Sequence, residues 1–535
     1  MLKTYQIENF KAFAGPETAN FSPITVIYGA NSSGKSSLLQ SLLLLKQSIE
    51  EPENNEILLL LKGRLVDLGG YREFIHRHEP ENQFSFKVTF PWVEGSEPPG
   101  IRELPKPIKP TTLSLCISFF LEQSSSLIRL AELSLFLGND VSPIATYKPK
   151  TVENKSKLQR RISYGHAGFT KRPQTVLMIS DINKNHSFWK DYWEHVDSKA
   201  TKLQLRTVGA KITKIEKEQV NNDKSKSLKS KQLNALKSTQ KKLKRHSFEV
   251  ALENYQKQNL KFFLACKNYL PFASGEMLSV NEKPTPWDFT KSLPDLSALT
   301  LYASSLFRDF LSSIVYLGPL RNNPERHYIY SGNLTDQVGK TGRYVPDTLF
   351  KDVDLLAKVN QQFEKFKLDY ELRVSCVGDE DHDLHDVFSL SLQDKRTGIR
   401  ANILDVGFGI SQVLPLIVQS MLSRGKTLCV EQPEIHLHPR LQAEIASLMA
   451  TGIAEPYNNR FIIETHSEHL MLRLQRLIRD KVLRSQDVSV IYIDRSTDAA
   501  RCIRLRIDEE GDFIDNWPDG FFEEGYNELF GGIND

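Results

Sequence analysis

A short glycine-bearing segment, residues 29–36, most constrains what this chain can fold into. It reads Gly-Ala-Asn-Ser-Ser-Gly-Lys-Ser, which is the spacing G-x-x-x-x-G-K-S of a phosphate-binding loop. An apolar run at 24–28 precedes it, and a stretch rich in Ser and Leu follows at 37–45. The segment is therefore expected to join a strand to a helix, the context in which this spacing has a physical meaning.

The residue types in this loop suit a bound triphosphate. Backbone N–H groups at the start of a helix would surround the phosphates. Lys35 would reach the β- and γ-phosphates, and the Ser36 hydroxyl would hold Mg²⁺, which keeps most of its water ligands. We expect ATP and Mg²⁺ as cofactors and a solvent-facing loop. The expected nucleotide-binding residues are Gly29, Asn31, Ser32, Ser33, Gly34, Lys35, Ser36 and Ser37.

The apolar periodicity changes along the chain and predicts three parts. Residues 1–150 hold the loop and, at 83–90 and 111–119, the alternation typical of antiparallel strands. Residues 151–310 are an inserted helical region, and residues 311–535 alternate strands with helices, which predicts a mostly parallel sheet. The predicted fold class is thus α/β, with a mostly parallel sheet, an antiparallel β subdomain and the helical insertion. In the last part we expect helices at 347–366, 439–449 and 467–480, and strands at 427–431, 460–464, 488–494 and 501–507.

Basic charge is concentrated in the insertion. Between 201 and 246 there are fourteen Lys or Arg against three acids, whereas the whole chain carries only +3. Helical spacing recurs here at 202–220, 227–243 and 248–269. We predict nucleic-acid binding through residues 200–246 by contacts to phosphates. A solvated helical face is the alternative, because the sequence does not show whether these charges share one surface.

Length and composition indicate a globular protein. The 535 residues are 40% hydrophobic, which is enough for a large core. We find no run of about 18 apolar residues and no secretory signal at the start, so we expect a cytoplasmic protein that does not bind membranes. The five cysteines are scattered and predict neither a disulfide framework nor a Cys-x-x-Cys metal site.

Polar groups follow two of the predicted parallel strands. The run 427–431 ends in Glu431, a carboxylate at the edge of a parallel sheet where Mg²⁺ sites lie. The run 460–464 leads to His466, which would contact the γ-phosphate from the same edge. The plainer alternatives are that Glu464 only ends its strand and that His466 caps the following helix.

A glycine turn at 405–412 lies between the loop at 29–36 and these strand ends. The loop, the turn, the acidic strand end and the histidine occur in the order found in ABC-type ATPases of the SMC, RecF and OLD-nuclease grouping. The chain resembles this family over about residues 1–130 and 311–510. The resemblance implies a P-loop ABC-type ATPase in which two copies hold nucleotide between the loop of one and the signature turn of the other. A homodimer or a higher assembly of dimers follows. The resemblance also places Glu431 in the metal site and implies that His466 is the switch histidine. The implied signature residues are Gly407, Gly409, Ser411 and Gln412.

One departure from the family bears on hydrolysis. Gln432 stands where the family has the glutamate that polarises the attacking water, and a neutral amide cannot accept a proton. Glu434 is the carboxylate that would substitute. The expected catalytic residues are Gln432, Glu434 and His466, with slow hydrolysis. Nearby, His436 and His438 either lie in the loop that crosses to the second copy or form a metal pair.

The sequence Glu-Gln-Pro-Glu-Ile-His-Leu-His-Pro at 431–439 is similar to that of the PtuA-like ATPases of Septu and retron anti-phage systems, which partner an HNH nuclease. Because no cluster of nuclease-like acids follows the ATPase motifs, we expect a nucleotide-gated protein that controls a separate nuclease. A RecF-like ATPase of DNA repair or chromosome maintenance, with real turnover, is the alternative. Arg321, in the sequence Gly-Pro-Leu-Arg, either contacts phosphate or a second copy or is structural.

Overall fold

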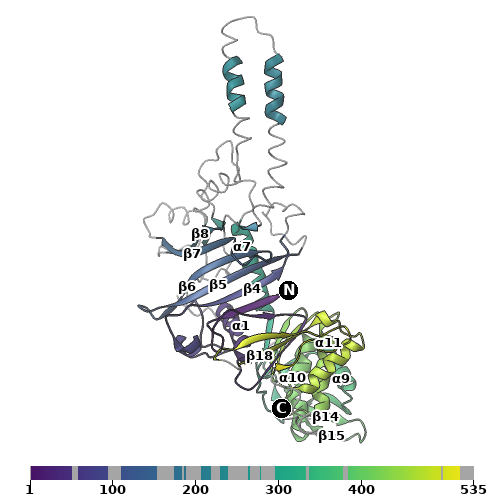
Figure 1. Ribbon diagram of the computed structural model, residues 1–535. Helices are drawn as coiled ribbons and strands as arrows, with labels where there is room; N and C mark the ends of the chain where they lie inside the picture. Colours follow the sequence, from purple (N-terminus) through teal and green to yellow (C-terminus); the bar gives the residue numbers. More distant parts are fainter. Residues whose placement is uncertain are drawn as a thin grey trace, which may run out of the picture. The chain divides into compact units, whose positions relative to one another are not determined.

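The computed structural model divides into two compact units (Figure 1). The antiparallel-sheet unit contains residues 87–307 with 54–58, and the parallel-sheet unit contains residues 2–53, 59–86 and 308–535. The residues that the structure describes are 2–50, 58–93, 110–152, 174–183, 186–187, 206–217, 229–238, 263–265, 277–278, 296–332, 336–377, 384–495 and 498–518.

Six strands of the described chain form the main sheet of the parallel-sheet unit. Its order is β11 (Ile314–Leu317), β16 (Thr427–Glu431), β17 (Arg460–Glu464), β3 (Ile24–Gly29), β18 (Val488–Asp494) and β19 (Arg501–Leu505). The first five strands run parallel, and β19 is antiparallel to β18. The inner strands are buried along nearly their whole length, which is why they read as continuous apolar runs. The predicted α/β class with a mostly parallel sheet is confirmed.

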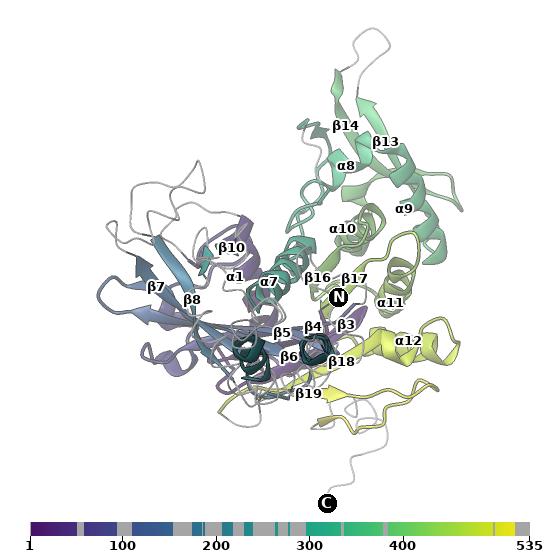
Figure 2. The ribbon, with the colours of Figure 1, turned by 90° about the horizontal axis from the view of Figure 1, so that it is seen from above.

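Helices follow these strands in the chain. α1 (Lys35–Glu50) begins directly after the loop that leaves β3, and α10 (Phe408–Leu422) precedes β16. α11 (Pro439–Ile453) and α12 (Glu468–Arg479) pack side by side (Figure 2). One core cluster joins Val26, Leu428 and Ile463 of the strands to Leu448 and Leu474 of these helices. Among the described residues, no helix combines the length and apolar character that a membrane span requires.

The expected helix at 347–366 is two helices. α8 (Val345–Lys351) ends at Asp352, whose backbone is extended, and α9 (Val353–Lys365) begins there. The Asp352 carboxylate accepts from the Leu355 N–H at 2.8 Å and so caps α9. These helices adjoin a smaller sheet in the order β12 (Tyr328–Ile329), β14 (Leu384–Asp394) and β13 (Tyr370–Val377), with β15 (Arg400–Asn402) paired to β14.

Near the amino end, β1 (Thr4–Glu8) and β2 (Glu17–Asn20) form an antiparallel hairpin, and α2 (Tyr71–Phe74) follows α1. The chain then enters the antiparallel-sheet unit through β4 (Phe84–Pro91) and leaves it along α7 (Leu296–Ser313). This unit confirms the predicted antiparallel β subdomain. Its sheet runs in the order β10 (Met277–Leu278), β9 (Phe263–Ala265), β8 (Gln174–Ile182), β7 (Ala145–Val152), β6 (Leu127–Leu137), β5 (Thr112–Glu122) and β4.

The described residues of the predicted insertion, 151–310, are not all helical, because they include β8, β9 and β10 beside the start of α7 and the helices 206–217 and 229–238. Val208 and Ile212 of the first pack against Leu233 and Leu236 of the second. The rest of the predicted basic region, 201–205, 218–228 and 239–246, lies outside the described residues.

The helix predicted at 248–269 is wrong where the structure can be compared. Residues 263–265 form β9, because they pair with β8 on one side and β10 on the other. The remainder of that predicted helix lies outside the described residues.

Candidate functional site

The loop after β3 is tightly folded, and two of its glycines are required by that fold. Gly29 has φ +144° and Gly34 has φ +114°, conformations that residues with a Cβ avoid. A Cβ at Gly29 would lie 2.5 Å from the carbonyl oxygen of Ile493, and one at Gly34 would lie 2.9 Å from the Ala12 Cβ. Packing against the backbone of Ile493 in β18 therefore requires glycine at 29, and packing against Ala12 requires it at 34.

Lys35 is folded back onto its own loop. Its Nζ donates to the carbonyl oxygens of Gly29 at 3.0 Å and Ala30 at 2.7 Å, and the residue is only 4% exposed. Burial lowers the pKa of this amine, against the opposing effect of nearby Glu464 and Glu434. Ala30, Asn31 and Ser32 of the loop are exposed, as expected, whereas Lys35 is buried because the loop offers carbonyl acceptors within its reach.

Two carboxylates end adjacent strands. Glu431 ends β16 and Glu464 ends β17, and the two residues are partners in the strand register. The Ser36 hydroxyl donates to Oε1 of Glu464 at 2.9 Å, whereas the Tyr316 hydroxyl donates to Oε1 of Glu431 at 2.8 Å. Burial, reinforced by repulsion from Glu431, raises the pKa of Glu464 to about 7, and burial also raises the pKa of Glu431. Sequence reasoning missed the contact between Ser36 and Glu464, although both predicted strands end in Glu.

A cavity of ≈ 670 Å³ opens beside the loop. It brings together several of the sequence-predicted residues, whereas Gly29, Ser33, Glu431 and Glu434 do not line it. The predicted residues in its wall are Asn31, Ser32, Gly34, Lys35, Ser36, Ser37, Gln432 and His466. Residues that the sequence did not single out for this cavity include the cationic or ionisable Lys11, His76, Arg77, His78 and Arg495, with Glu464, Glu73 and Asp498 as the acids.

The residues after β16 are held against the end of β17. Gln432 has a left-handed backbone, φ +45°, and its N–H donates to the carbonyl oxygen of Glu464 at 2.7 Å. Oε1 of Glu434 accepts from the backbone N–H of His466 at 2.6 Å. Burial raises the pKa of Glu434 and lowers that of His466, with Lys35 lowering the latter further. Glu434 thus orients the segment that carries His466, while Gln432 and His466 face the cavity.

Buried polar atoms without a hydrogen-bond partner gather at this edge of the sheet. They are Nε and Nη1 of Arg321, Oε2 of Glu434, Oε2 of Glu464, Nε2 of His466 and Oγ of Ser33. Each such atom costs about 1–3 kcal/mol when left unpaired, so a concentration of them fits a site that is completed by a polar ligand. The amine of Lys35, the hydroxyl of Ser36 and the strand-end carboxylates fit a triphosphate and its Mg²⁺.

Within the described chain, no three His, Cys, Asp or Glu side chains converge on one metal position. A magnesium ion beside Ser36 would therefore take most of its oxygen ligands from phosphate and water, as this ion commonly does. His438 caps α11, since its Nδ1 accepts from the N–H of Arg440 at 3.3 Å. This contact gives His438 a structural role in the chain.

Arg321 lies behind the carboxylates. Its Nη2 donates to the carbonyl oxygen of Glu431 at 3.5 Å. Burial lowers the pKa of its guanidinium to about 10, against the opposing charges of Tyr316, Glu431 and Glu434. The guanidinium thus partly neutralises the acids of this edge.

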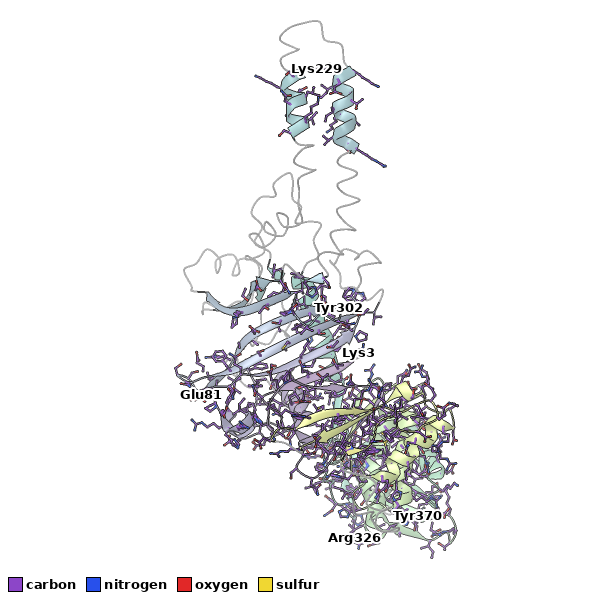
Figure 3. All side chains as sticks on the ribbon, viewed as in Figure 1. Lys3, Glu81, Lys229, Tyr302, Arg326 and Tyr370 are labelled. Carbon is purple, nitrogen blue, oxygen red and sulfur yellow. The ribbon has the colours of Figure 1, made fainter. Side chains whose placement is uncertain are left out.

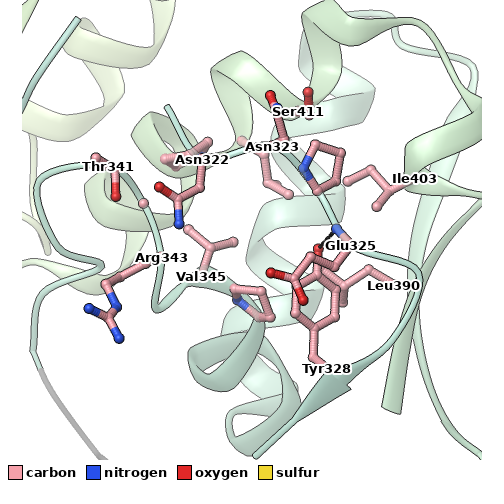
Figure 4. A pocket seen from close by; sticks show the side chains of 15 residues that line it. Asn322, Asn323, Glu325, Tyr328, Thr341, Arg343, Val345, Leu390, Ile403 and Ser411 are labelled. Carbon is pink, nitrogen blue, oxygen red and sulfur yellow. Dashed lines mark hydrogen bonds between the residues drawn. The ribbon is translucent and has the colours of Figure 1, made fainter. Parts of the chain in front are cut away.

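The implied signature residues lie at the start of α10 and none of them lines the cavity beside the loop. Gly407 is the exposed N-cap, and a Cβ at Gly409 would lie 3.1 Å from the carbonyl oxygen of His436. Ser411 is buried and lines a separate cavity of ≈ 90 Å³ (Figure 4). The Gln412 side chain is buried as well, and its Nε2 has no partner. A pairing of this turn with the loop of a second copy stays a prediction.

Comparison with known proteins gives a family match over most of the chain. The family model described as AAA ATPase domain matches residues 1–471, and one described as a protein of unknown function, DUF3696, matches residues 483–530. No curated protein matches the chain.

Three solved structures have a weak overall likeness. The Smc head domain of Pyrococcus furiosus, bound to the C-terminal domain of ScpA, is 11% identical, with 94% of this chain and 96% of that chain covered and a TM-score of 0.35. The SMC head domain of Thermotoga maritima is 10% identical, with 95% and 99% covered and a TM-score of 0.35. An SmcHead bound to the C-winged helix domain of ScpA is 9% identical, with 94% and 98% covered and a TM-score of 0.38. At these TM-scores the likeness carries no argument.

Proposed function

The chain belongs to the AAA ATPase domain family, and from this premise we propose that it binds ATP with Mg²⁺ at residues 29–36 as an ABC-type ATPase. The observation that carries the proposal is the cavity of ≈ 670 Å³ in which the loop meets Gln432, Glu464 and His466. Lys11, Lys35, Arg77 and Arg495 in its wall suit the charge of a triphosphate.

The residues of the site divide the work of binding. The amine of Lys35 would exchange the carbonyl oxygens of Gly29 and Ala30 for phosphate oxygens. The Ser36 hydroxyl would hold Mg²⁺, which neutralises phosphate charge when bound. His466, whose pKa is lowered by burial, is neutral at pH 7 and is suited to a single hydrogen bond with the γ-phosphate. The Gln432 amide orients a water but cannot take its proton, so we expect slow hydrolysis.

We extend the proposal to assembly and partners. Two nucleotide-bound copies would pair, the loop of one against the turn at 407–412 of the other. The helices 206–217 and 229–238 would contact nucleic acid, and the assembly would control a separate HNH nuclease in anti-phage defence. The support is the apolar contact between the two helices, which Figure 3 draws with their side chains, together with the basic side chains exposed on them. Those exposed on the helices are Arg206, Lys211, Lys214, Lys217, Lys231 and Lys237.

The substitution Lys35→Ala tests nucleotide binding. We expect a loss of affinity for a fluorescent ATP analogue of about 100-fold or more, because the cation that faces the phosphates is removed. Light scattering should show a dimer for the wild type with MgATP and a monomer for the variant. Lys148→Ala, at an exposed lysine of β7, is the matched control. Wild-type affinity in Lys35→Ala, or no ATP binding by the wild type, would refute the proposal.

A RecF-like repair ATPase with real turnover is the alternative. It is favoured by the two carboxylates near Lys35, Glu434 and Glu464, which offer a proton acceptor where Gln432 does not. Phosphate release that is fast, stimulated by DNA and lost in Glu434→Ala or Gln432→Ala would favour this alternative. Slow release that DNA does not change would favour the gated protein.

A further inference from the structure

We propose that Glu464, at the end of β17, is the carboxylate that positions Mg²⁺ beside Ser36, and that Glu431 stands behind it. The inference rests on the proposed binding of MgATP and names a residue beyond it.

The sheet topology places Glu464 closer to the loop than Glu431. β17 lies between β16 and β3 in the sheet, so the end of β17 is next to the strand from which residues 29–36 emerge. Neighbouring strands are about 4.8 Å apart, so Glu431 is one strand spacing farther away. A metal held by the Ser36 hydroxyl would therefore meet Glu464 first.

Glu464 already contacts the hydroxyl that would hold the metal. The Ser36 Oγ donates its proton to Oε1 of Glu464 at 2.9 Å, which leaves the lone pairs of Oγ for a cation. The residue is 3% exposed and lines the cavity, and its Oε2 has no hydrogen-bond partner. Oε2 is thus a buried oxygen without a partner, on a carboxylate whose other oxygen is hydrogen-bonded to Ser36. Such an oxygen is suited to a divalent cation or to a water that the cation holds.

Glu431 is engaged elsewhere. Its Oε1 accepts from the Tyr316 hydroxyl at 2.8 Å, its backbone carbonyl faces Arg321, and it does not line the cavity. Its carboxylate is thus directed to β11 and lends negative charge to the site from behind. Glu434, which follows Glu431 closely in the chain, is also engaged elsewhere. Its Oε1 accepts from the backbone N–H of His466, and it does not line the cavity.

The ratio of nucleotide affinity with Mg²⁺ to that in EDTA tests the inference. In Glu464→Gln we expect affinity for a fluorescent ATP analogue in EDTA to be retained and the gain from Mg²⁺ to fall by about tenfold or more, the usual cost of losing a group that supports a metal. Glu444→Gln is the matched control, a buried carboxylate of α11 that pairs with Arg473 and does not line the cavity, and should keep the wild-type ratio. Glu464→Asp, which keeps the charge but shortens the side chain, should reduce the ratio in part.

Binding of Mn²⁺ followed by electron paramagnetic resonance gives a second readout that needs no hydrolysis. Glu464→Gln should weaken Mn²⁺ binding to the nucleotide complex, and Glu431→Gln should weaken it less. A wild-type magnesium ratio in Glu464→Gln, together with a lost ratio in Glu431→Gln, overturns the inference alone. Absence of nucleotide binding by the wild type overturns the proposed function and the inference with it.

Discussion

At the level of single residues, the local sequence predicts only part of the site around the cavity. Gly29 and Gly34 could be placed from the chain alone, because the spacing of a phosphate-binding loop is local and each glycine answers a local backbone conformation. The contact of Ser36 with Glu464 could not, because it depends on β17 lying between β16 and β3. Burial of Lys35 was missed for a similar reason, since the acceptors Gly29 and Ala30 become available only in the folded loop.

Gln432→Glu tests the role of position 432 in hydrolysis. A carboxylate there would face the cavity and could accept a proton from water, so phosphate release should rise by about tenfold or more, within the range of general-base effects. The control is Gln40→Glu, the same change in another wall of the same cavity, which should leave the rate nearly constant. Equal rates in both variants would show that the attacking water does not lie beside Gln432.

At the level of helices and strands, sequence patterns located the last part of the chain well. The expected strands at 427–431, 460–464 and 488–494 have the bounds of β16, β17 and β18. Such buried runs with polar flanks are easily read. The break between α8 and α9 was missed, because an Asp within an apolar-periodic stretch is ambiguous until its side chain is seen to cap the next turn. Strand β9 was missed because it pairs with β8, which is distant in the chain.

Gly452→Ala tests the packing of α11 on β17. An alanine inside a helix normally stabilises by up to about 1 kcal/mol relative to glycine. Here the new Cβ would lie 2.6 Å from the Phe461 ring, so over-packing should lower the free energy of unfolding by about 1–3 kcal/mol. Gly209→Ala, in the helix 206–217 where a Cβ meets nothing within 4 Å, is expected to shift stability in the opposite direction. The melting temperatures of both variants provide the check. A higher melting temperature for Gly452→Ala than for the wild type would contradict the tight packing against Phe461.

Asp487→Asn tests an ion pair at the entry to β18. The carboxylate of Asp487 accepts from the Arg484 guanidinium at 3.0 and 2.7 Å and from its backbone N–H at 3.1 Å. Burial acts to raise the pKa of Asp487, but the bonds from Arg484 outweigh it and the pKa is lowered. The pair therefore stabilises the fold above about pH 4, and this contribution is lost as the pH falls through the lowered pKa.

We expect Asp487→Asn to lower the free energy of unfolding by about 1–2 kcal/mol at pH 7. The difference from the wild type should shrink as the pH falls below about 4 and through the lowered pKa of Asp487. Melting temperatures measured across this range provide the check. Asp480→Asn, which removes an exposed pair with Arg476, should change stability by less than about 0.5 kcal/mol at any pH. A pH-independent loss in Asp487→Asn would exclude an electrostatic origin.

On the scale of the whole molecule, the parallel-sheet unit contains every residue of the proposed nucleotide site, and the antiparallel-sheet unit contains the basic helices. Composition predicted this separation of charge, because the Lys-rich stretch is contiguous in the chain. It did not predict that Val208 and Ile212 of one helix would pack against Leu233 and Leu236 of the other. That arrangement needs the two helices to be seen together.

The double substitution Lys211→Glu and Lys214→Glu tests binding of nucleic acid. These exposed residues are three apart and share a helix face. We expect weaker binding to labelled DNA and RNA of any sequence, and a salt dependence of affinity reduced by about two phosphate contacts. Fluorescence anisotropy at several salt concentrations measures both quantities. Lys148→Glu serves as the control, and a wild-type salt dependence in the double variant would argue for a merely solvated face.

The register pairing of Glu431 with Glu464 has a mechanical consequence for the empty and loaded forms. The two carboxylates at adjacent strand ends repel each other, and a divalent cation at Glu464 would reduce this electrostatic repulsion. Glu431 is tied to Tyr316, and the tip of β17 continues through His466 into the Ser467 cap of α12. Binding of the cation should therefore stabilise the ends of β16 and β17 and the first turn of α12. Slower amide hydrogen exchange at the start of α12 in the loaded form is the expected result.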